Sequence, residues 1–351
     1  MLDGQSCDEY SCFLELRIVE RHSMEQLLSS LNLPWTPDWA AIFGVERPLI
    51  LDIGFGYGHS LAHLHRTRPD HNIIGLEVDN TCLLKVEKAI ARHGWHNVRV
   101  VYSFAQTALY HLLLPGTLHE VHINFPDPWF KKRHARRRLM QRDTLDAIVN
   151  RMVVGGKFFL ATDILDYAEM THELLAQTPG LTNDLPTPWA NAMPERAITK
   201  YERRALQEGR TCYYFAYHRN QHPAPDVPVI KELDMPHVVI KTQLTLDEML
   251  TRVNVPDYAG EDGTHVRYLE RYRGERSVLF DVYVHEPTIE QRISVVIVER
   301  DGTTDEYTIK LGSIGMPRPT AGLHIAVGRL RDAVLQLSDS IQIIQDKVRG
   351  G

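Results

Sequence analysis

The sequence predicts an α/β chain with a mostly parallel sheet, followed by a smaller α+β domain with an antiparallel sheet. Three observations carry this prediction. Apolar runs alternate with amphipathic segments from Pro48 to about residue 220, which is the rhythm of a parallel sheet covered by helices on both faces. Prolines then crowd residues 221–229, and alternating strand patterns follow them. The length of 351 residues also suggests two domains, which we place at 48–220 and 230–351.

The first domain is predicted from its apolar runs, with helices between them from Ser60 and through Ile90. A proline-rich loop is expected over residues 178–197. Before this domain, residues 23–32 have apolar residues at helical spacing, so 1–47 is expected to be a helical extension. The predicted strands are LILDIG, NIIGLEV, VRVVYS, EVHINF, KFFLATD and TCYYFAYHR.

The second domain is predicted from alternating strands and a helical pattern. SVLFDVYVHE and ISVVIVERDGTTDEYTIKLG alternate as antiparallel strands do, with a hairpin signal at Asp301-Gly302. A long amphipathic helix should follow, and two interpretations of it stay open: a helix packed on its own sheet, or the seam of a homodimeric coiled coil. Its apolar residues lie alternately four and three apart: Leu323, Val327, Leu330, Val334, Leu337, Ile341, Ile344 and Val348.

Composition excludes several classes of protein. With 43% hydrophobic and 24% charged residues, no apolar stretch long enough for a membrane helix and no signal-like start, we expect a cytoplasmic protein without a membrane partner. Four cysteines without a C-x-x-C pair argue against a zinc ribbon or a disulfide framework, and the histidine clusters lack companion ligands, so we expect no metal. The net charge is −6, yet Lys131–Arg138 holds six cations and no anion. The basic charge is therefore local.

A glycine-rich turn follows the first predicted strand and predicts a cofactor site. Gly54, Gly56 and Gly58 allow a tight turn and close approach of a ligand, and the acidic Asp52 precedes them. The spacing G-x-G-x-G differs from the dinucleotide pattern, and a carboxylate at this point would repel a pyrophosphate but can hold an ammonium group. Glu77 ends the next strand, where it can accept hydrogen bonds from ribose hydroxyls. These features favour S-adenosylmethionine over a nicotinamide dinucleotide.

A proline-flanked acid and a basic run predict the substrate site. Asp127 lies between Pro126 and Pro128 at the carboxyl end of a predicted strand, where ligands bind in open α/β sheets. The stiff loop suits a group that holds a reactant, although a structural loop with a capping Asp would look the same. Six cations within Lys131–Arg138 repel one another without a polyanion, which favours RNA as the partner.

These motifs resemble those of the tRNA (guanine-N7-)-methyltransferase family over residues 39–219, above all in the block F-P-D-P-W-F-K-K-R-H-A-R-R-R. The resemblance implies a Rossmann-like class I methyltransferase fold with a mostly parallel seven-stranded sheet. It also implies methyl transfer from S-adenosylmethionine to N7 of a guanosine in the variable loop of tRNA, at position 46. The acidic C-terminal domain is a departure from the short members of this family, and its role is not predicted.

The resemblance implies roles for individual residues. Asp52, Glu77 and Asp127 would bind the cofactor with the glycine turn, and Asp127 would also be the catalytic residue. Phe104 stands where the family commonly has Asp or Asn beside the adenine; its ring can stack on that base, and Ser103 is an alternative polar contact. The substrate-binding set is Lys131, Arg133, Arg136, Arg137, Arg138, Asp163, Thr199, Lys200, Tyr201 and Glu202.

Guanine N7 carries a lone pair and no proton, so methyl transfer needs positioning more than a general base, and Asp127 would orient the guanine. Two alternatives stay open. Asp-Pro-Trp loosely resembles the loop of amino-group methyltransferases, which predicts an N6- or N2-methylpurine product. Phe104 would also suit a catalytically impaired tRNA-binding module that has lost its cofactor.

Overall fold

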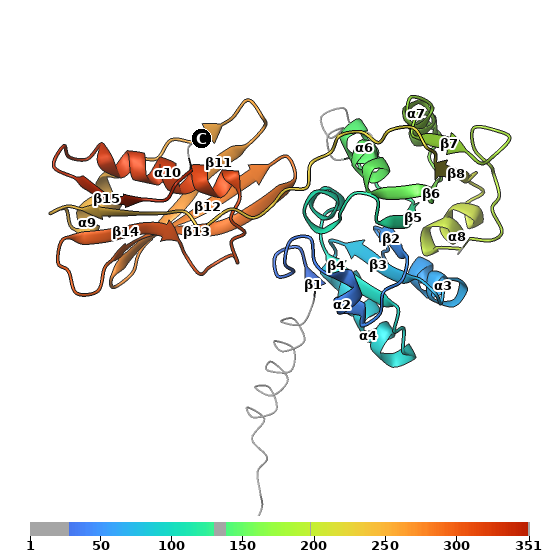
Figure 1. Ribbon diagram of the computed structural model, residues 1–351, viewed down its shortest axis with the longest axis horizontal. Helices are drawn as coiled ribbons and strands as arrows, with labels where there is room; N and C mark the ends of the chain where they lie inside the picture. The colour runs from blue at the N-terminus through green and yellow to red at the C-terminus, as the bar shows by residue number, and fades with distance from the viewer. Residues whose placement is uncertain (1–27, 130–137, 197, 350–351) are drawn as a thin grey trace, which may run out of the picture. The chain divides into compact units, whose positions relative to one another are not determined.

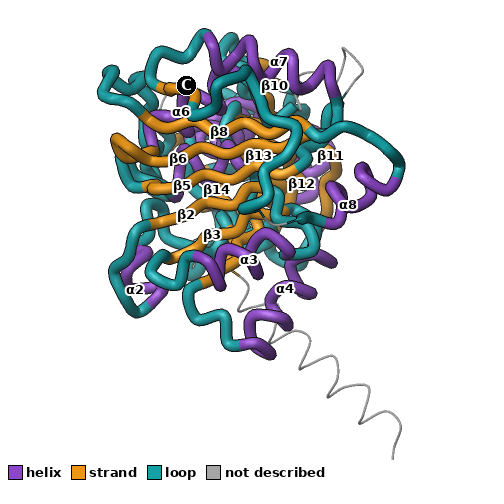
Figure 2. The backbone as a smooth tube through the Cα atoms, turned by 90° about the vertical axis from the view of Figure 1, so that its right-hand side faces the viewer, coloured by secondary structure: helices purple, strands orange, loops and turns teal. Residues whose placement is uncertain are grey.

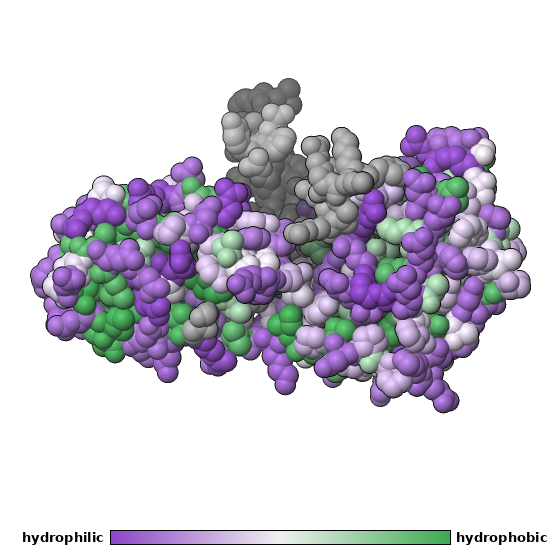
Figure 3. All heavy atoms as spheres, turned by 90° about the horizontal axis from the view of Figure 1, so that it is seen from above, coloured by the Kyte–Doolittle hydropathy of each residue, from purple (hydrophilic) through white to green (hydrophobic). Residues whose placement is uncertain are grey.

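The structure is a computed structural model that describes residues 28–129, 138–196 and 198–349 (Figure 1). The chain divides into two compact units, residues 1–229 and 230–351. Hydrophilic residues cover much of both units on the face seen in Figure 3, with smaller apolar patches between them. Within the described ranges, no helix is long and apolar enough to cross a membrane.

The first unit is built on one eight-stranded sheet, with the order β1-β4-β3-β2-β5-β6-β8-β7. The neighbours from β1 to β6 are parallel, whereas β8 is antiparallel to β6 and β7 is antiparallel to β8. Figure 2 shows β8, β6, β5, β2 and β3 side by side in this order. The strands are β1 (Leu28–Ser29), β2 (Leu49–Ile53), β3 (Asn72–Glu77), β4 (Val98–Tyr102), β5 (Leu118–Asn124), β6 (Met152–Thr162), β7 (Leu181–Asn183) and β8 (Tyr213–Arg219).

This topology confirms the predicted fold class, a Rossmann-like, mostly parallel sheet, with the two-residue β1 added at one edge. The chain leaves β2 towards β3 and β4 on one side, and returns through β5 to β6 on the other. The carboxyl ends of β2 and β5 therefore border the crevice where ligands bind in such sheets. The central strands β2 and β3 are mostly apolar and buried, as parallel strands covered on both faces are expected to be, whereas β5 also buries the polar Glu120 and His122.

Helices connect these strands and several have identifiable caps. Asp79 caps α4 by accepting a hydrogen bond from Cys82 N at 2.9 Å, and Gly94 ends it with a left-handed conformation. The helices are α2 (Trp39–Phe43), α3 (His59–Thr67), α4 (Asn80–His93), α5 (Ala105–Thr107), which continues as the π-helix η1 (Ala108–Leu112), α6 (Arg142–Arg151), α7 (Leu165–Ala176) and α8 (Lys200–Gln207).

The prediction of a helix over residues 23–32 was wrong for its described part. Leu28 and Ser29 pair in parallel with Val101 and Tyr102, and the chain turns directly afterwards. The Asn32 side chain accepts a hydrogen bond from Ser29 N at 2.7 Å and so stabilises that turn. The apolar spacing was misleading because the free edge of β4 offers these residues backbone partners.

Arg151, at the end of α6, is fully buried although it carries a charge. Burial lowers the pKa of its guanidinium, which donates hydrogen bonds to the carbonyls of Leu109 at 2.7 Å and Pro228 at 2.8 Å. Its neighbour Asn150 donates to Pro225 O at 2.8 Å. Residues 225–228 of the proline-rich segment are therefore bound to the end of α6 by partly buried hydrogen bonds.

The second unit is an antiparallel sheet with the order β10-β11-β12-β13-β14-β9-β15 and two helices. The predicted strands around Asp301-Gly302 are confirmed as β13 and β14, and Gly302 has φ 77°. Its elements are β9 (His237–Lys241), α9 (Leu246–Arg252), β10 (Tyr258–Ala259), β11 (His265–Arg273), β12 (Ser277–Glu286), β13 (Ile289–Glu299), β14 (Glu306–Leu311), α10 (Ala321–Leu335) and β15 (Gln342–Asp346).

The predicted long helix ends earlier than expected, and its apolar side is not a dimer seam. Leu323, Val327, Leu330 and Val334 are fully buried in the core formed with the sheet. The helix stops at Leu335, a turn with a Ser338–Ser340 hydroxyl contact of 2.8 Å follows, and β15 then pairs with the edge of β9. The interpretation of a helix packed on its own sheet was correct up to Leu335, and the coiled-coil interpretation was wrong.

Candidate active site

The glycine turn joins β2 to α3 and needs each of its three glycines. Gly54, Gly56 and Gly58 have φ of 72°, 53° and 78°, a region that other residues rarely adopt. At Gly58 a Cβ would also lie 2.7 Å from a methyl carbon of Val86 on α4. The turn therefore presents bare backbone to the crevice, next to the free N–H groups at the start of α3.

Asp52 lies beneath this turn and is fully buried. Its Oδ1 accepts a hydrogen bond from Asn124 Nδ2 at 3.4 Å, whereas its Oδ2 has no hydrogen-bond partner among the described residues. Burial raises the pKa of Asp52 to about 7, although a hydrogen bond from Ser60 and the charge of Arg196 oppose this rise. A buried carboxylate with a free oxygen fits a cationic or hydrogen-bonding ligand group.

Glu77 and Phe104 lie at the carboxyl ends of the two neighbouring strands. The Glu77 carboxylate accepts hydrogen bonds from Gly56 N at 2.9 Å and Val78 N at 2.8 Å, so it is anchored to the glycine turn. Phe104 is the second residue after the end of β4 and is 51% exposed, as a ring that stacks on a ligand base would be. Ser103 is buried and donates its hydroxyl to Phe104 O at 2.9 Å, so it is not turned outward.

The first turn of α8 lies over the glycine turn. Tyr201 Cε2 is 3.9 Å from the position a Cβ would take on Gly56, and Lys200 Nζ is 4.2 Å from the centroid of the Tyr57 ring. Together they leave a narrow cleft of about 20 Å³, which Ser60 also lines. Lys200 and Tyr201 are thus brought to the cofactor region that the sequence predicts.

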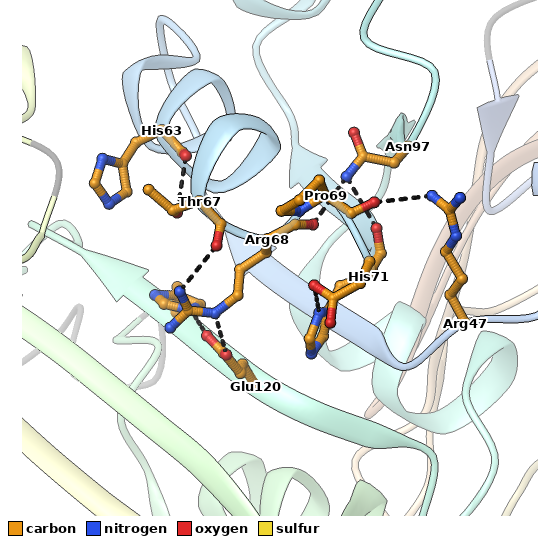
Figure 4. A network of polar contacts seen from close by, with 10 residues as sticks. Arg47, His63, Thr67, Arg68, Pro69, His71, Asn97 and Glu120 are labelled. Atoms are coloured by element: carbon orange, nitrogen blue, oxygen red, sulfur yellow. Dashed lines mark hydrogen bonds and ion pairs between the residues drawn. The ribbon is translucent and has the colours of Figure 1, made fainter.

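A larger cavity of about 270 Å³ adjoins this cleft, because Ser60 and Asn124 line both. Figure 4 shows part of its wall, where Arg68 donates to Glu120 Oε1 at 2.7 Å and to Thr67 O at 3.3 Å. The second oxygen of Glu120 lies 2.9 Å from His122 Nε2. These hydrogen bonds hold the pKa of Glu120 at about 2, despite its burial.

Asp127 is exposed on the loop that follows β5, and it lines neither cavity. Phe125 and Trp129, on either side of the P-D-P segment, have positive φ of 52° and 41°, which residues other than glycine rarely adopt. Arg138 donates to Pro128 O at 3.1 Å and Trp129 O at 3.4 Å. The loop is therefore held by side-chain bonds as well as by its prolines.

Comparison with known proteins gives the family. A family model described as a putative methyltransferase matches residues 46–215. A tRNA (guanine-N(7)-)-methyltransferase of Thermus thermophilus is 32% identical over 314 residues, which cover 89% of this chain and 96% of the relative. The chain belongs to the tRNA (guanine-N7-)-methyltransferase family. The alignment of 314 residues is longer than the first unit, which ends at residue 229. Part of the second unit of this methyltransferase therefore also aligns with the Thermus relative.

Other similar proteins match about half of the chain. A tRNA (guanine-N(7)-)-methyltransferase of Burkholderia lata is 36% identical over 203 residues, 57% of this methyltransferase and 79% of the relative. Among solved structures, the 16S rRNA methyltransferase KamB has a TM-score of 0.40 and 17% identity over 52% of this chain and 92% of that chain.

The predicted substrate residues of the methyltransferase also hold its own structure together. Thr199 and Glu202 form a capping box at the start of α8, with Glu202 N donating to Thr199 Oγ1 at 3.1 Å. In return, Glu202 Oε2 accepts a hydrogen bond from Thr199 N, and Glu202 Oε1 accepts one from the Tyr214 hydroxyl at 2.6 Å. Asp163 is in an ion pair with Arg210, and Arg138 bonds the loop carbonyls as described above. Substrate roles for these residues stay predictions.

The main basic run is not part of this description. Lys131, Arg133, Arg136 and Arg137 lie outside the described residues. Among those that are described, no group of three or more His, Cys, Asp or Glu side chains is placed to hold a metal ion.

Two residues of the site were missed by the sequence analysis. Asn124 and Arg196 are 72 residues apart, and the Arg196 Nη2 atom donates to the Asn124 Oδ1 atom beside Asp52. Asn124 ends the same strand that delivers Asp127, which is the signal that would have found it. Arg196 gave no such signal, because it lies in an irregular segment next to Pro194.

Proposed function

We propose that this chain transfers the methyl group of S-adenosylmethionine to N7 of the variable-loop guanosine at position 46 of tRNA, in the cytosol. The observation that carries the proposal is membership of the tRNA (guanine-N7-)-methyltransferase family, with 32% identity along 96% of the Thermus relative. The glycine turn at the carboxyl end of β2, with the unpaired Oδ2 atom of Asp52 beneath it, supports the cofactor. Enzymes of this class act by positioning.

The cofactor fits the donor set of the crevice. Glu77, already fixed by backbone N–H groups, would accept the ribose hydroxyls, and the exposed ring of Phe104 would stack on the adenine. The free Oδ2 of Asp52 suits the ammonium group. When bound, S-adenosylmethionine supplies an electrophilic methyl group.

Asp127 is the residue we propose for catalysis. Guanine N7 has no proton to lose, so this carboxylate would not act as a base; it would orient the guanine edge and stabilise the positive charge that grows on the purine. The stiff loop supports this role because a misplaced group loses most of its effect. Arg138 contributes by bonding the carbonyls of Pro128 and Trp129.

For tRNA we propose two groups of cations. The first is the run Lys131–Arg138. The second lies beside the narrow cleft: Lys85 Nζ is 4.4 Å and Lys200 Nζ 4.2 Å from the centroid of the Tyr57 ring. Arg203 belongs to this group, because burial first and then the charges of Arg203, Lys85 and Lys200 lower the pKa of His59. Clustered cations of this kind attract phosphates.

The test is mass spectrometry of nucleosides from tRNA incubated with the purified full-length protein and labelled S-adenosylmethionine. The expected product is 7-methylguanosine at position 46, whereas an N6- or N2-methylpurine would show an amino-group methyltransferase instead. Asp127→Ala should lower turnover about 100-fold or more and leave tRNA affinity nearly unchanged. Asp166→Ala, an exposed aspartate on α7, is the matched control. Unchanged turnover in Asp127→Ala would contradict the proposed role.

A titration with S-adenosylmethionine separates the remaining alternative. A chain that binds tRNA but shows no heat of cofactor binding would be an RNA-binding module rather than an enzyme. Phe104 is the residue that raises this alternative, so Phe104→Ala, which removes the ring without adding a polar contact, is the informative second variant. If the ring stacks on adenine, this substitution should weaken cofactor binding about 5- to 10-fold, because stacking of an aromatic pair contributes about 1 kcal/mol.

A further inference from the structure

The guanidinium of Arg196 is buried beside the cofactor cleft with one nitrogen atom unpaired. As a residue Arg196 is partly exposed, yet its Nη1 atom is inaccessible to solvent and has no hydrogen-bond partner in the described part of the chain. Its Nη2 atom donates to Asn124 Oδ1, and its guanidinium carbon lies 5.7 Å from the centroid of the Phe159 ring. A buried donor without a partner is costly, which points to a ligand.

Arg196 and Asp52 form an incomplete pair. Asn124 lies between them: its amide nitrogen donates to Asp52 Oδ1 at 3.4 Å and its amide oxygen accepts from Arg196. Asp52 and Arg196 thus each bond to Asn124 through one atom. A second atom of each, Asp52 Oδ2 and Arg196 Nη1, has no hydrogen-bond partner among the described residues. Burial lowers the pKa of Arg196 to about 10, so the guanidinium is still positively charged at neutral pH.

A cavity lies directly beside Arg196 and Asn124. The cavity of about 270 Å³ is lined by Arg196, Asn124 and Ser60, and the last two residues also line the narrow cleft under the glycine turn. His63 and Glu195 contribute to the same wall. Asp52 itself lines neither space, but Asn124, which is bonded to both charged groups, lines both.

We propose that Asp52 and Arg196 together recognise the amino-acid end of S-adenosylmethionine, with Asp52 accepting its ammonium group and Arg196 donating to its carboxylate. The proposal rests on the cofactor assigned under Proposed function. An α-amino acid carries its two opposite charges on one carbon atom, so its site needs an acid and a base close together but not paired with each other. Asn124 bonds to both Asp52 and Arg196, and so takes the place of a direct ion pair between them. Asp52 alone would repel the ligand carboxylate in this buried place.

The proposal predicts which part of the cofactor Arg196 senses. S-adenosylhomocysteine keeps the aminoacyl group, whereas 5′-methylthioadenosine keeps the adenosine and the thioether sulfur but lacks that group. Arg196→Met should weaken S-adenosylhomocysteine binding about 10- to 100-fold, the range expected for losing a charged hydrogen bond. Binding of 5′-methylthioadenosine should change less than about threefold, because that ligand never reaches the guanidinium.

Isothermal titration of the full-length protein with both ligands is the test. Arg204→Met is the matched control, because Arg204 is exposed on α8 and is paired with Glu208 at its surface. Unchanged S-adenosylhomocysteine affinity in Arg196→Met would overturn the proposal, and so would equal losses for the two ligands, which would mean that Arg196 only supports the fold. If Arg196→Met does not fold, Arg196→Lys must show the same selective loss. Failure of the unaltered protein to bind either ligand would instead contradict the proposed function.

Discussion

Asp52→Asn should stabilise the cofactor-free protein while it weakens cofactor binding. The pKa of Asp52 is raised from 3.8 to about 7 in the folded chain, because burial disfavours the charged carboxylate. Below pH 3.8 the group is protonated in both folded and unfolded chains and has no effect. As pH rises, the unfolded chain releases this proton first, so the folded state loses stability until the pH passes about 7. Asparagine carries no charge at any pH and avoids this loss.

The size of the effect follows from the shift. The pKa of Asp52 differs by about three units between the folded and unfolded chains, and each unit corresponds to about 1.36 kcal/mol. The ionised form therefore lowers the free energy of unfolding by at most about 4 kcal/mol at pH 8, and by about 2 kcal/mol at pH 5. The gain in the free energy of unfolding from Asp52→Asn should therefore be about 2 kcal/mol larger at pH 8 than at pH 5. Other titrating groups cancel because both proteins carry them.

Tryptophan fluorescence during urea unfolding is the assay. All five tryptophans lie within residues 1–229, so the signal reports the first unit alone: Trp35, Trp39, Trp95, Trp129 and Trp189. A stability difference that stays constant between pH 5 and pH 8, or a less stable variant, would refute the argument that Asp52 is buried at a cost. Saturating S-adenosylhomocysteine should reverse the order of stability, since it stabilises only the protein that binds it.

Four further variants have expected outcomes. Arg137→Ala should weaken tRNA binding and reduce the slope of log affinity against log salt by about 0.7, measured by titration at several salt concentrations, whereas Arg138→Ala should also slow turnover because it bonds the loop of Asp127. Lys85→Glu should weaken tRNA binding and leave S-adenosylhomocysteine affinity unchanged; a change in the latter would place Lys85 at the cofactor instead. Leu330→Ala should destabilise the second unit by about 2–5 kcal/mol, seen as faster hydrogen exchange confined to residues 230–351.

The parallel sheet was predictable because each of its strands is a short apolar run, and the order of runs and helices leaves few topologies. The end of α10 was not, since Ile341 and Ile344 continue the four-and-three spacing although they belong to a turn and a strand. The serines at 338 and 340, which bond each other in the turn, were the only local stop signal. Pairing with β9 decided the outcome, and such a partner is invisible in the local pattern.

Some residues of the candidate site could likewise be predicted from the sequence, and others could not. The glycine turn and Asp52 are contiguous in sequence, so spacing alone revealed them. Thr199 and Glu202 fit the S/T-x-x-E signature of a capping box, and that signal was available but overlooked. The contact between Arg196 and Asn124 joins segments that only the tertiary fold brings together, so no spacing rule could have revealed it.

Arg151 sets where the catalytic half of the chain can be cut. A fragment that stops at Asn220, where the last strand of the first sheet has just ended, would remove the carbonyls of Val227 and Pro228 that receive this buried cation. An isolated catalytic fragment should therefore extend to Val229. The end of the proline-rich segment is therefore part of the folded first unit and not only a linker to the second.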